Sequence, residues 1–355
     1  MPPPYGIVFR TPEGVWIVKD HGKTELLGNI SPEADTVQFC STGEYILVGT
    51  YETSGEWAYS AIEVSTEKQV DLNPGKDQVF CYAEWWPGRC DTIMADVQPW
   101  LEVGRYCQSI PAVLDLSSNL SFIGNKASIF SGVHVPSSDG KLVAFTQDAQ
   151  PWIYRWGIGS QPLTVQSYIF PLINAGFIRP TWSPDNSQVA WLVWGEMNGE
   201  WTEGIGIFDL KNNHSLFSYP HQVWAGEFPS YLFWNPHKDY ILLDTPDGHM
   251  SVLNLDGSEQ YSVESAMDPK WSPDGQWLTY ALVDNRDRTV YVRSADGEEL
   301  HKIGPGVPIK WSPESRFILY RKYEASIWMT EVGVWNPERV NLPDDAVIMD
   351  WIGLK

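Results

Sequence analysis

The residues best suited to chemistry are four tryptophans and four titratable side chains in a few long connecting segments. They are Trp100, Trp152, Trp201, Trp224, Glu196, Glu200, Glu227 and His221. An aromatic ring in a loop can bind a sugar or a partner side chain, and a carboxylate or imidazole beside it can transfer a proton. The competing interpretation is that each tryptophan folds down over its own sheet and only completes the core.

No catalytic motif accompanies these residues. The sequence contains no Gly-x-Ser-x-Gly turn, phosphate loop, dinucleotide-binding glycine pattern, Cys-x-x-Cys or His-Glu-x-x-His. The acidic turns at 284–287 and 296–297 lack the carboxylate spacing of a calcium loop. A carboxylate pair can act on a glycosidic bond, but 45 acidic residues do not single out a pair. We therefore predict no cofactor and no metal, with ligation by some of the seven scattered histidines as the alternative.

The elements that carry these residues follow an internal repeat. A tryptophan, a Ser-Pro-Asp-Gly-like turn and an alternating apolar strand occur together at Trp182, Trp271 and Trp311. Weaker anchors of the same kind lie at Phe39, Trp85, about Val135, Trp234 and Trp351. Proline presets φ at the first corner of such a turn, and Asp, Asn or Gly tolerates the second. Successive anchors are 37 to 52 residues apart, which leaves room for four short strands.

This pattern predicts an all-β fold, a single closed β-propeller of four-stranded blades that spans residues 1–355 as one domain. The first blade is composite, because residues of about 5–28 supply three strands and residues 346–353 supply the fourth. That pairing closes the ring and removes two open sheet edges. We expect eight blades, with seven as the alternative because the copy near Val135 is poorly defined.

The Trp-Ser-Pro-Asp-Gly copies, clearest at Trp271–Gly275, resemble the TolB-like, WD-repeat-like β-propeller repeats of bacterial proteins. The resemblance covers nearly the whole chain and is strongest at residues 182–320. It implies the propeller fold. It does not select a function, because such repeats occur in periplasmic scaffold proteins, in the propeller domains of prolyl-oligopeptidase-type peptidases and in polysaccharide lyases.

The four cysteines, Cys40, Cys81, Cys90 and Cys107, all fall in the first third of the chain. An even, clustered set indicates disulfides and an oxidising compartment. In a propeller, Cys81 and Cys107 reach the same face of one blade, and Cys40 and Cys90 occupy equivalent turns of adjacent blades. We therefore expect the pairs Cys81–Cys107 and Cys40–Cys90, with four buried free thiols as the alternative.

The net charge of −21 restricts the partners. Such a chain repels phosphate backbones and anionic lipid surfaces, so we expect no nucleic-acid partner. A cationic partner would be attracted; otherwise the charge serves only to keep the protein in solution. No apolar stretch has the length of a membrane-spanning helix, and the first residues do not resemble a signal peptide. The cysteines favour a secreted, periplasmic or cell-surface location of a trimmed chain, with the cytoplasm as the alternative.

These observations favour a monomeric, non-catalytic binding or scaffold propeller. It would recognise a protein or glycan partner through the aromatic and acidic loops on one face. The alternative is a carbohydrate-active enzyme, a glycoside hydrolase or a polysaccharide lyase, with a pocket on the propeller axis.

Overall fold

The computed structural model describes residues 5–19, 23–28, 30–76, 78–99, 110–117, 119–123, 134–148, 150–163, 173–197, 200–211, 214–218, 221–222 and 231–353. These ranges contain β-strands and turns and no helix. None of them therefore forms a helix that could cross a membrane. Short runs rich in β-branched and aromatic residues, separated by Gly, Pro and Asp, favour this all-β arrangement.

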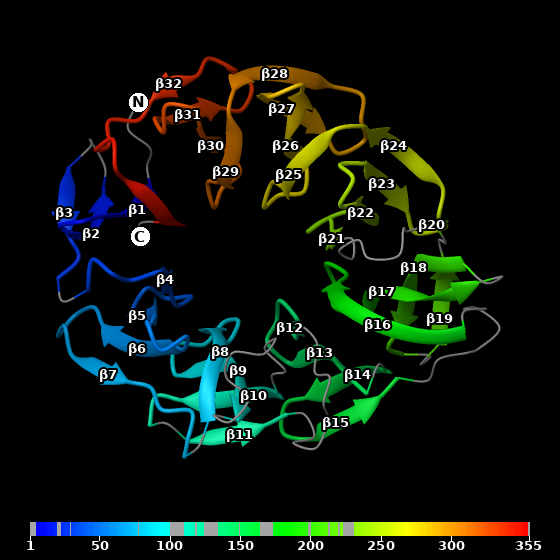
Figure 1. Cartoon of the computed structure of the whole chain (residues 1–355), viewed down its shortest axis with the longest axis horizontal. Helices are drawn as coiled ribbons and strands as arrows, with labels where there is room; N and C mark the ends of the chain where they lie inside the picture. Colours follow the sequence, from blue (N-terminus) through cyan, green and yellow to red (C-terminus); the bar gives the residue numbers. More distant parts are fainter. Residues whose placement is uncertain are drawn as a thin grey trace. The chain divides into compact units, whose positions relative to one another are not determined.

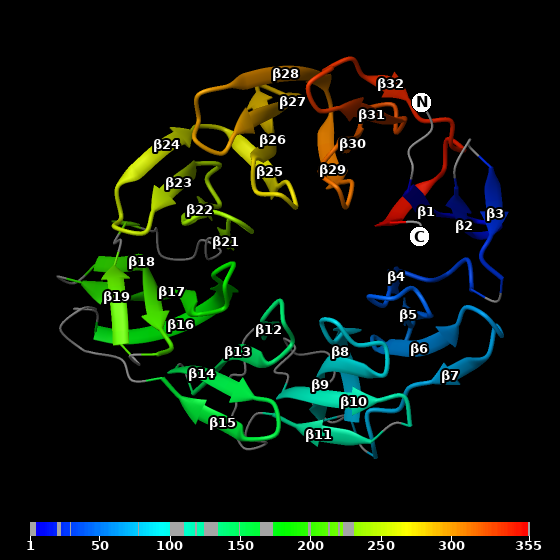
Figure 2. The same cartoon turned by 180° about the vertical axis from the view of Figure 1, so that it is seen from behind.

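Two compact units divide the chain. Figures 1 and 2 show the strands of the chain from opposite sides. Unit 1 comprises Met1–Glu33 and Phe228–Lys355, and unit 2 comprises Ala34–Glu227. Every pairing between neighbouring strands is antiparallel. Most strands belong to four-stranded sheets in which sequence neighbours are also spatial neighbours.

Unit 1 contains four such sheets, named A, E, F and G. Sheet A has the order β3-β2-β1-β33, with β1 at Tyr5–Thr11, β2 at Gly14–Val18, β3 at Thr24–Leu26 and β33 at Val347–Gly353. Sheet E consists of β21 Tyr231–Trp234, β22 Tyr240–Asp244, β23 Met250–Asn254 and β24 Glu259–Val263. Sheet F consists of β25 Ala266–Trp271, β26 Trp277–Asp284, β27 Asp287–Ser294 and β28 Leu300–Pro305. Sheet G consists of β29 Val307–Trp311, β30 Phe317–Arg321, β31 Ile327–Glu331 and β32 Glu338–Arg339.

Unit 2 contains sheets B, C and D. Sheet B joins two four-stranded groups through one pair, Trp57↔Phe80. The first group is β4 Thr36–Phe39, β5 Tyr45–Tyr51, β6 Trp57–Glu63 and β7 Gln69–Asp71, and the second is β8 Gln78–Trp85, β9 Thr92–Pro99, β10 Ile110–Asp115 and β11 Leu120–Phe122. Sheet C is β12 Val135–Pro136, β13 Leu142–Gln147, β14 Gln150–Arg155 and β15 Gly159–Pro162. Sheet D is β16 Ile173–Trp182, β17 Gln188–Met197, β18 Glu200–Asp209, β19 His214–Ser218 and the short β20 His221–Gln222.

The core lies between successive sheets of each unit. One cluster packs Leu242 and Val252 of sheet E against Leu278 and Tyr280 of sheet F. Another packs sheet F against sheet G in the same way. Because both faces of an inner sheet are covered, its strands carry longer apolar runs than a half-exposed strand would.

The repeat tryptophans join neighbouring sheets by a hydrogen bond as well as by packing. The indole N–H of Trp85 donates to the carbonyl of Gln38, 3.0 Å away, in the preceding four-stranded group. Trp182 makes the same bond to Val135 at 2.9 Å. In unit 1, the indole groups of Trp271 and Trp311 donate to the carbonyls of Phe233 and Lys270, at 3.3 and 3.1 Å. The anchor residue thus sets the spacing between consecutive first strands.

The turn after the anchor is closed by its own side chains. The Ser272 hydroxyl donates to the Asp274 carboxylate at 2.6 Å, and the N–H of Trp277 donates to the Ser272 hydroxyl at 3.0 Å. Gly275 has a φ of +66°, and a Cβ there would lie 2.3 Å from Oδ1 of Asn235. Glycine is therefore needed at Gly275 for both its conformation and its close approach to the preceding sheet.

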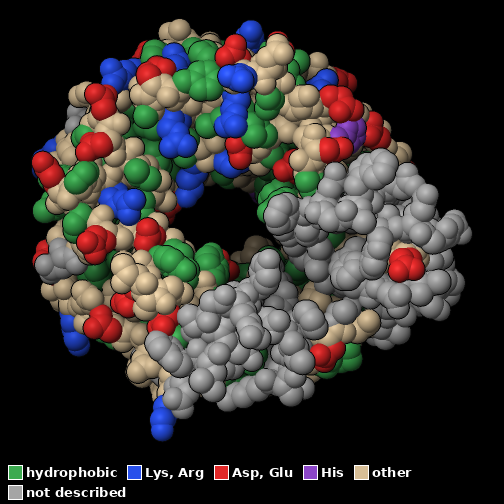
Figure 3. Space-filling view, in the orientation of Figure 1, with side chains coloured by type: hydrophobic (Ala, Val, Ile, Leu, Met, Phe, Trp, Pro, Cys, Tyr) green, Lys and Arg blue, Asp and Glu red, His purple; other side chains and the backbone are tan. Residues whose placement is uncertain are grey.

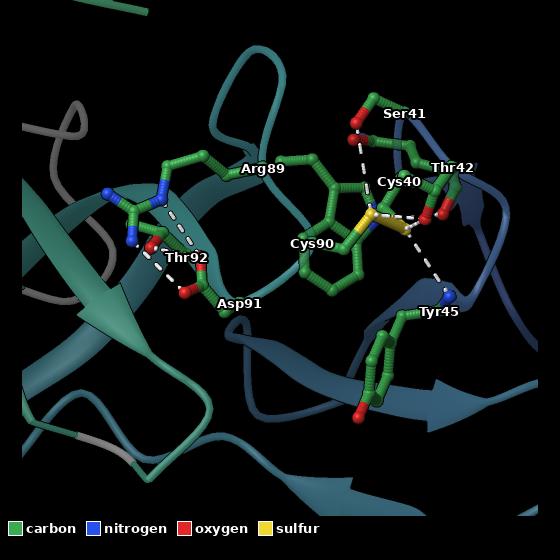
Figure 4. Close-up of a disulfide and its surroundings, with 10 residues drawn as sticks. Cys40, Ser41, Thr42, Tyr45, Arg89, Cys90, Asp91 and Thr92 are labelled. Atoms are coloured by element: carbon green, nitrogen blue, oxygen red, sulfur yellow. Dashed lines mark hydrogen bonds and ion pairs between the residues drawn. A yellow bond between two sulfur atoms is a disulfide. The ribbon is translucent and has the colours of Figure 1, made fainter.

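A disulfide links two such turns in unit 2. Cys40 follows β4 and Cys90 precedes β9, and their Cα atoms are 5.2 Å apart. Around the bond, the N–H of Tyr45 donates to Sγ of Cys40 at 3.3 Å, and the Thr42 hydroxyl donates to Sγ of Cys90 at 3.1 Å (Figure 4). This is the pair that equivalent turns of adjacent four-stranded groups predict.

The two ends of the chain meet in sheet A. Strand β33 pairs with β1 from Tyr5↔Gly353 to Arg10↔Val347. Trp351 is buried in a cluster with Ile7 and Leu319. The C-terminal strand therefore completes the N-terminal sheet, as the composite first blade requires.

Replacing Trp351 with alanine should lower the stability of unit 1 by about 3–5 kcal/mol, because a buried indole is removed from a packed cluster. Val347→Ala is the matched control on the same strand, since Val347 is 43% exposed and Trp351 only 3%. Thermal and urea unfolding of both variants would measure the difference. An equal, small effect of the two substitutions would contradict the closing role of β33.

Candidate functional site

Sheet D carries the longest hairpin among the described residues. Strands β17 and β18 have ten residues each, whereas β26 and β27 of sheet F have eight, β5 and β6 of sheet B have seven, and β22, β23, β30 and β31 of sheets E and G have five. The short strand β20 pairs with β18 beside this hairpin. We call the part formed by residues 194–197, 200–203 and 221–222 the sheet D extension.

Four predicted site residues lie in the sheet D extension. Glu196 is directly opposite Trp201, Met197 is opposite Glu200, and Glu203 is opposite His221. Opposite residues of antiparallel strands share a face, and alternate residues of one strand do too. The register therefore assigns positions 196, 201, 203 and 221 to one face, and position 200 to the other.

Of the remaining predicted residues, the structure describes only Trp152. Trp152 lies in β14 of sheet C, where its ring stacks on Phe145 with centroids 6.3 Å apart and an interplanar angle of 30°. It is half-buried, so part of the ring covers its own sheet, as the competing interpretation expects. Trp100, Trp224 and Glu227 lie outside the described residues.

The structure describes only one residue of the second expected cysteine pair, Cys81–Cys107. Cys81, in β8, is disulfide-bonded. Its expected partner, Cys107, lies outside the described residues.

A buried ionisable group in unit 2 was not identified from the sequence. Nδ1 of His134 is 2.8 Å from Oδ1 of Asp96, and only 2% of the His134 side chain is exposed. Nε2 of His134 is also buried and has no hydrogen-bond partner in the described part of the chain. Nearby, the Tyr82 hydroxyl donates to Oε2 of Glu84 at 3.1 Å. The group consists of His134, Asp96, Glu84 and Tyr82.

Burial and charge act together on the acid–base properties of this group. Burial raises the pKa of Glu84, although His134 and the Tyr82 hydroxyl act in the opposite direction. For His134, burial favours the neutral ring, but the Asp96 carboxylate and then Glu84 outweigh it, so the net effect raises its pKa. Burial also raises the pKa of Tyr82. The imidazole is thus paired with Asp96 and influenced by the charge of Glu84, and its second nitrogen is buried.

The position of His134 in the repeat is the one feature of the sequence that could have indicated this group. His134 stands two residues before Pro136, which occupies the anchor position, and the same place holds Pro269 and Ile309 in sheets F and G. A histidine at a position that is otherwise apolar marks a departure from the repeat. The link to Asp96 itself has no signal in one sequence, because it spans 38 residues.

A second histidine network, in sheet E, has the connectivity of a Ser–His–acid triad. Nε2 of His249 is 2.9 Å from the Ser251 hydroxyl oxygen, and Nδ1 is 2.9 Å from the Glu264 carboxylate. However, Ser251 is only 1% exposed, and its hydroxyl donates to Glu259 at 3.2 Å. A nucleophile must reach its substrate, so this network holds the strands together and does not form an active site.

The described ranges contain no group of three or more His, Cys, Asp or Glu side chains that could hold a metal ion.

Comparison with known proteins identifies the fold. No protein-family model and no curated protein matches the sequence. Among solved structures, the Dos1 propeller is similar with a TM-score of 0.60 and 13% identity over 88% of this chain and 86% of that chain. An oligogalacturonate lyase in complex with manganese is similar with a TM-score of 0.54 and 12% identity over 83% of this chain and 84% of that chain.

TolB from Acinetobacter baumannii shares 17% identity over 85% of this chain and 63% of that chain, with a TM-score of 0.42. The Dos1 propeller supports the β-propeller fold that the repeats predict. The fold is a β-propeller, and at these identities the likeness concerns the fold alone.

The stability of the protein should fall as the pH rises, owing to Glu84 and His134. A group whose pKa is raised by folding stabilises the folded state below its ordinary pKa, and this contribution is lost as the pH passes the raised value. The window therefore starts above 4.5 for Glu84 and above 6.5 for His134. In Glu84→Gln, the free energy of unfolding should fall less steeply with pH than in the wild type, by at most about 1.4 kcal/mol per pH unit. Urea unfolding of both proteins between pH 5 and 8 measures these slopes. Equal slopes for the two proteins would contradict the role of Glu84.

Proposed function

We propose that this protein is a non-catalytic binding propeller that recognises a protein or glycan partner through the acidic and aromatic face of the sheet D extension. The observation that carries the proposal is the register that places Glu196 opposite Trp201, with Glu203 and His221 on the same face. An aromatic residue provides a large contact area at low entropic cost, and flanking carboxylates orient hydrogen-bond donors of the partner.

The length of the hairpin supports this proposal. The corresponding strands complete the core with five residues in sheets E and G and with eight in sheet F. The ten-residue strands of sheet D exceed even the longer of these lengths. Residues that project from a rigid scaffold are common sites of recognition. Trp100, Trp152, Trp224 and Glu227 remain proposed members of the same binding surface.

The net charge of −21 indicates which partner groups would be attracted. Cationic groups approach an acidic surface faster and anionic groups are repelled. We therefore propose partners that are neutral or positively charged, and no nucleic acid.

We further propose that the four-stranded groups are the blades of one closed, eight-bladed ring, a single monomeric domain of residues 1–355. The support is the β1–β33 pairing, which joins the two ends of the chain in one four-stranded sheet. Small-angle X-ray scattering should then give a radius of gyration of about 20 Å, the value for a compact chain of this length. A clearly larger radius would contradict the single ring.

The disulfide supports an extracytoplasmic location. Cys40 and Cys90 are bonded and Cys81 is also disulfide-bonded, and such bonds persist in oxidising compartments. We propose a secreted, periplasmic or cell-surface protein.

The test of the binding function compares the two faces of the sheet D extension. Glycan and peptide arrays are probed with the labelled wild type and with Trp201→Ala, Glu196→Gln and Glu200→Gln. For any ligand found, we expect Trp201→Ala to weaken binding by about 30-fold, the effect of a loss of about 2 kcal/mol at a hot spot. Glu196→Gln should weaken it less.

Glu200→Gln is the matched control, because position 200 is on the opposite face of the same hairpin and the charge change is identical. The proposal fails if all three variants bind as the wild type does. Conversion of a bound glycan to products would instead establish the carbohydrate-active enzyme.

A further inference from the structure

A cavity in unit 1 lies well apart in sequence from the sheet D extension. It has a volume of about 530 Å³. Its walls come from the β22–β23 turn at 244–248, the β24–β25 connection at 265–268, and single residues of β21 and β26. This volume is within the range of small-ligand sites, which begins at about 300 Å³.

Two carboxylates without a counter-ion line the cavity. Asp244 ends β22, and Asp268 belongs to the irregular part of β25, where the register shifts between Met267 and Lys270. Neither side chain makes a hydrogen bond or an ion pair with any residue that the structure describes. A third lining carboxylate, Asp247, is already bound by the Thr245 hydroxyl and by the N–H of His249.

The irregular part of β25 explains why Asp268 lies at the cavity. In sheet F two residues, Asp268 and Pro269, intervene between the paired positions Met267 and Lys270. Sheet G has a register shift at the equivalent place, and Val307–Lys310 there corresponds to Met267–Lys270. Asp268 therefore aligns with Pro308, so the neighbouring sheet has an uncharged residue at this position.

The charged form of Asp244 is poorly stabilised by the protein itself. Burial, and then the charge of Asp268, raise the pKa of Asp244 to about 6, although Lys270 acts in the opposite direction. A cation bound between the two carboxylates would supply the missing counter-charge. Relief of the repulsion between the two carboxylates would then contribute to the binding energy of a positively charged ligand.

An aromatic wall distinguishes this cavity from a mere group of acidic residues. Tyr231 lines it with 48% of its surface exposed. Its ring stacks on that of Phe233, with centroids 6.3 Å apart and an interplanar angle of 11°. Phe233, which is 38% exposed, lies behind Tyr231 and is not itself part of the cavity wall. The face of an aromatic ring attracts cations, in particular guanidinium groups.

The surrounding surface has the same sign of charge. Figure 3 shows acidic side chains gathered around a histidine over the part of unit 1 that contains β23 and β24 in Figure 1. Glu264 of this part is 82% exposed and belongs to the loop that leads into the cavity wall. A cationic ligand would be attracted before it reaches the cavity.

We propose that the Asp244–Asp268–Tyr231 cavity binds an organic cation, a guanidinium or ammonium group, with the carboxylates as counter-ions and the tyrosine ring as one wall. The group can belong to a basic side chain of a partner protein or to a free amine. The site goes beyond the proposed function, because it lies in unit 1 and the sheet D extension lies in unit 2.

The test measures binding of small probes to the full chain by calorimetry and by NMR. The probes are N-acetyl-arginine amide, N-acetyl-lysine amide and agmatine, with N-acetyl-glutamine amide and a neutral disaccharide as uncharged references. We expect the cations to bind and the uncharged probes not to bind. Tighter binding of the amino-acid amides than of agmatine assigns the site to a partner side chain, and the reverse order assigns it to a free amine.

Substitutions locate the site. Asp244→Asn and Asp268→Asn should each weaken the cation at least tenfold, and Tyr231→Ala should weaken arginine more than lysine, because a guanidinium group stacks better on a ring. Asp256→Asn is the matched control: Asp256 lies in the β23–β24 turn of the same sheet and outside the cavity. It should leave the affinity unchanged.

A measurement on the wild type does not depend on how the variants fold. Saturation with the arginine probe should lower the pKa of Asp244, observed by its carboxyl carbon signal. Equal binding of the uncharged probes, equal loss in Asp256→Asn, or an unchanged Asp244 signal in the presence of the cations would each overturn the proposal. These outcomes are separable from the sheet D test, since Trp201→Ala should not affect the cation.

Discussion

The hydrogen bond from an anchor indole to the carbonyl of the preceding unit is the constraint on which the other features depend. It recurs four times in the described residues with distances of 2.9 to 3.3 Å. The bond is directional, so it sets the spacing and orientation of consecutive first strands more closely than apolar packing alone. Where the anchor side chain is buried, as at Trp182 and Trp311, loss of this bond would be costly.

The acceptor in each case is a backbone carbonyl, and this has a consequence for function. The residues that supply it are glutamine, valine, phenylalanine and lysine, at positions 38, 135, 233 and 270. Since every residue type has the same carbonyl, the side chain there can change without loss of the bond. The scaffold therefore permits variation of these side chains in its first strands. At position 233, for example, the phenylalanine that supplies the carbonyl also stacks on Tyr231 of the cavity wall.

The sequence predicted the parts of the structure that depend on local pattern. Turn chemistry and strand alternation are local, so the four-stranded groups and the pairing of Trp351 with the first sheet followed from the repeat. The Cys40–Cys90 pair followed because both residues occupy the same turn of the unit. The sheet D extension was expected as loops, whereas Glu196 and Trp201 belong to continuous strands. Alternation of Trp, Glu and Thr is compatible with either state, and only the pairing decides it.

Features that depend on contacts between sheets were not predictable from one sequence. The approach of His134 to Asp96 requires the relative placement of two sheets, and so does the proximity of Asp244 to Asp268. Local patterns contain no information on which of 45 acidic residues become neighbours. The division into two compact units is also a property of the whole set of contacts.

The departures from the repeat share a physical property, which bears on why they are present. His134 with Asp96 replaces apolar packing, and a buried ion pair is seldom more stable than the apolar residues it replaces. Asp244 and Asp268 repel each other, and the charge of Lys270 compensates Asp244 only in part. The scaffold does not require the histidine, because sheets F and G have Pro269 and Ile309 where sheet C has His134. In a fold where each unit repeats one stable solution, groups that lower its stability are best explained by interactions with other molecules.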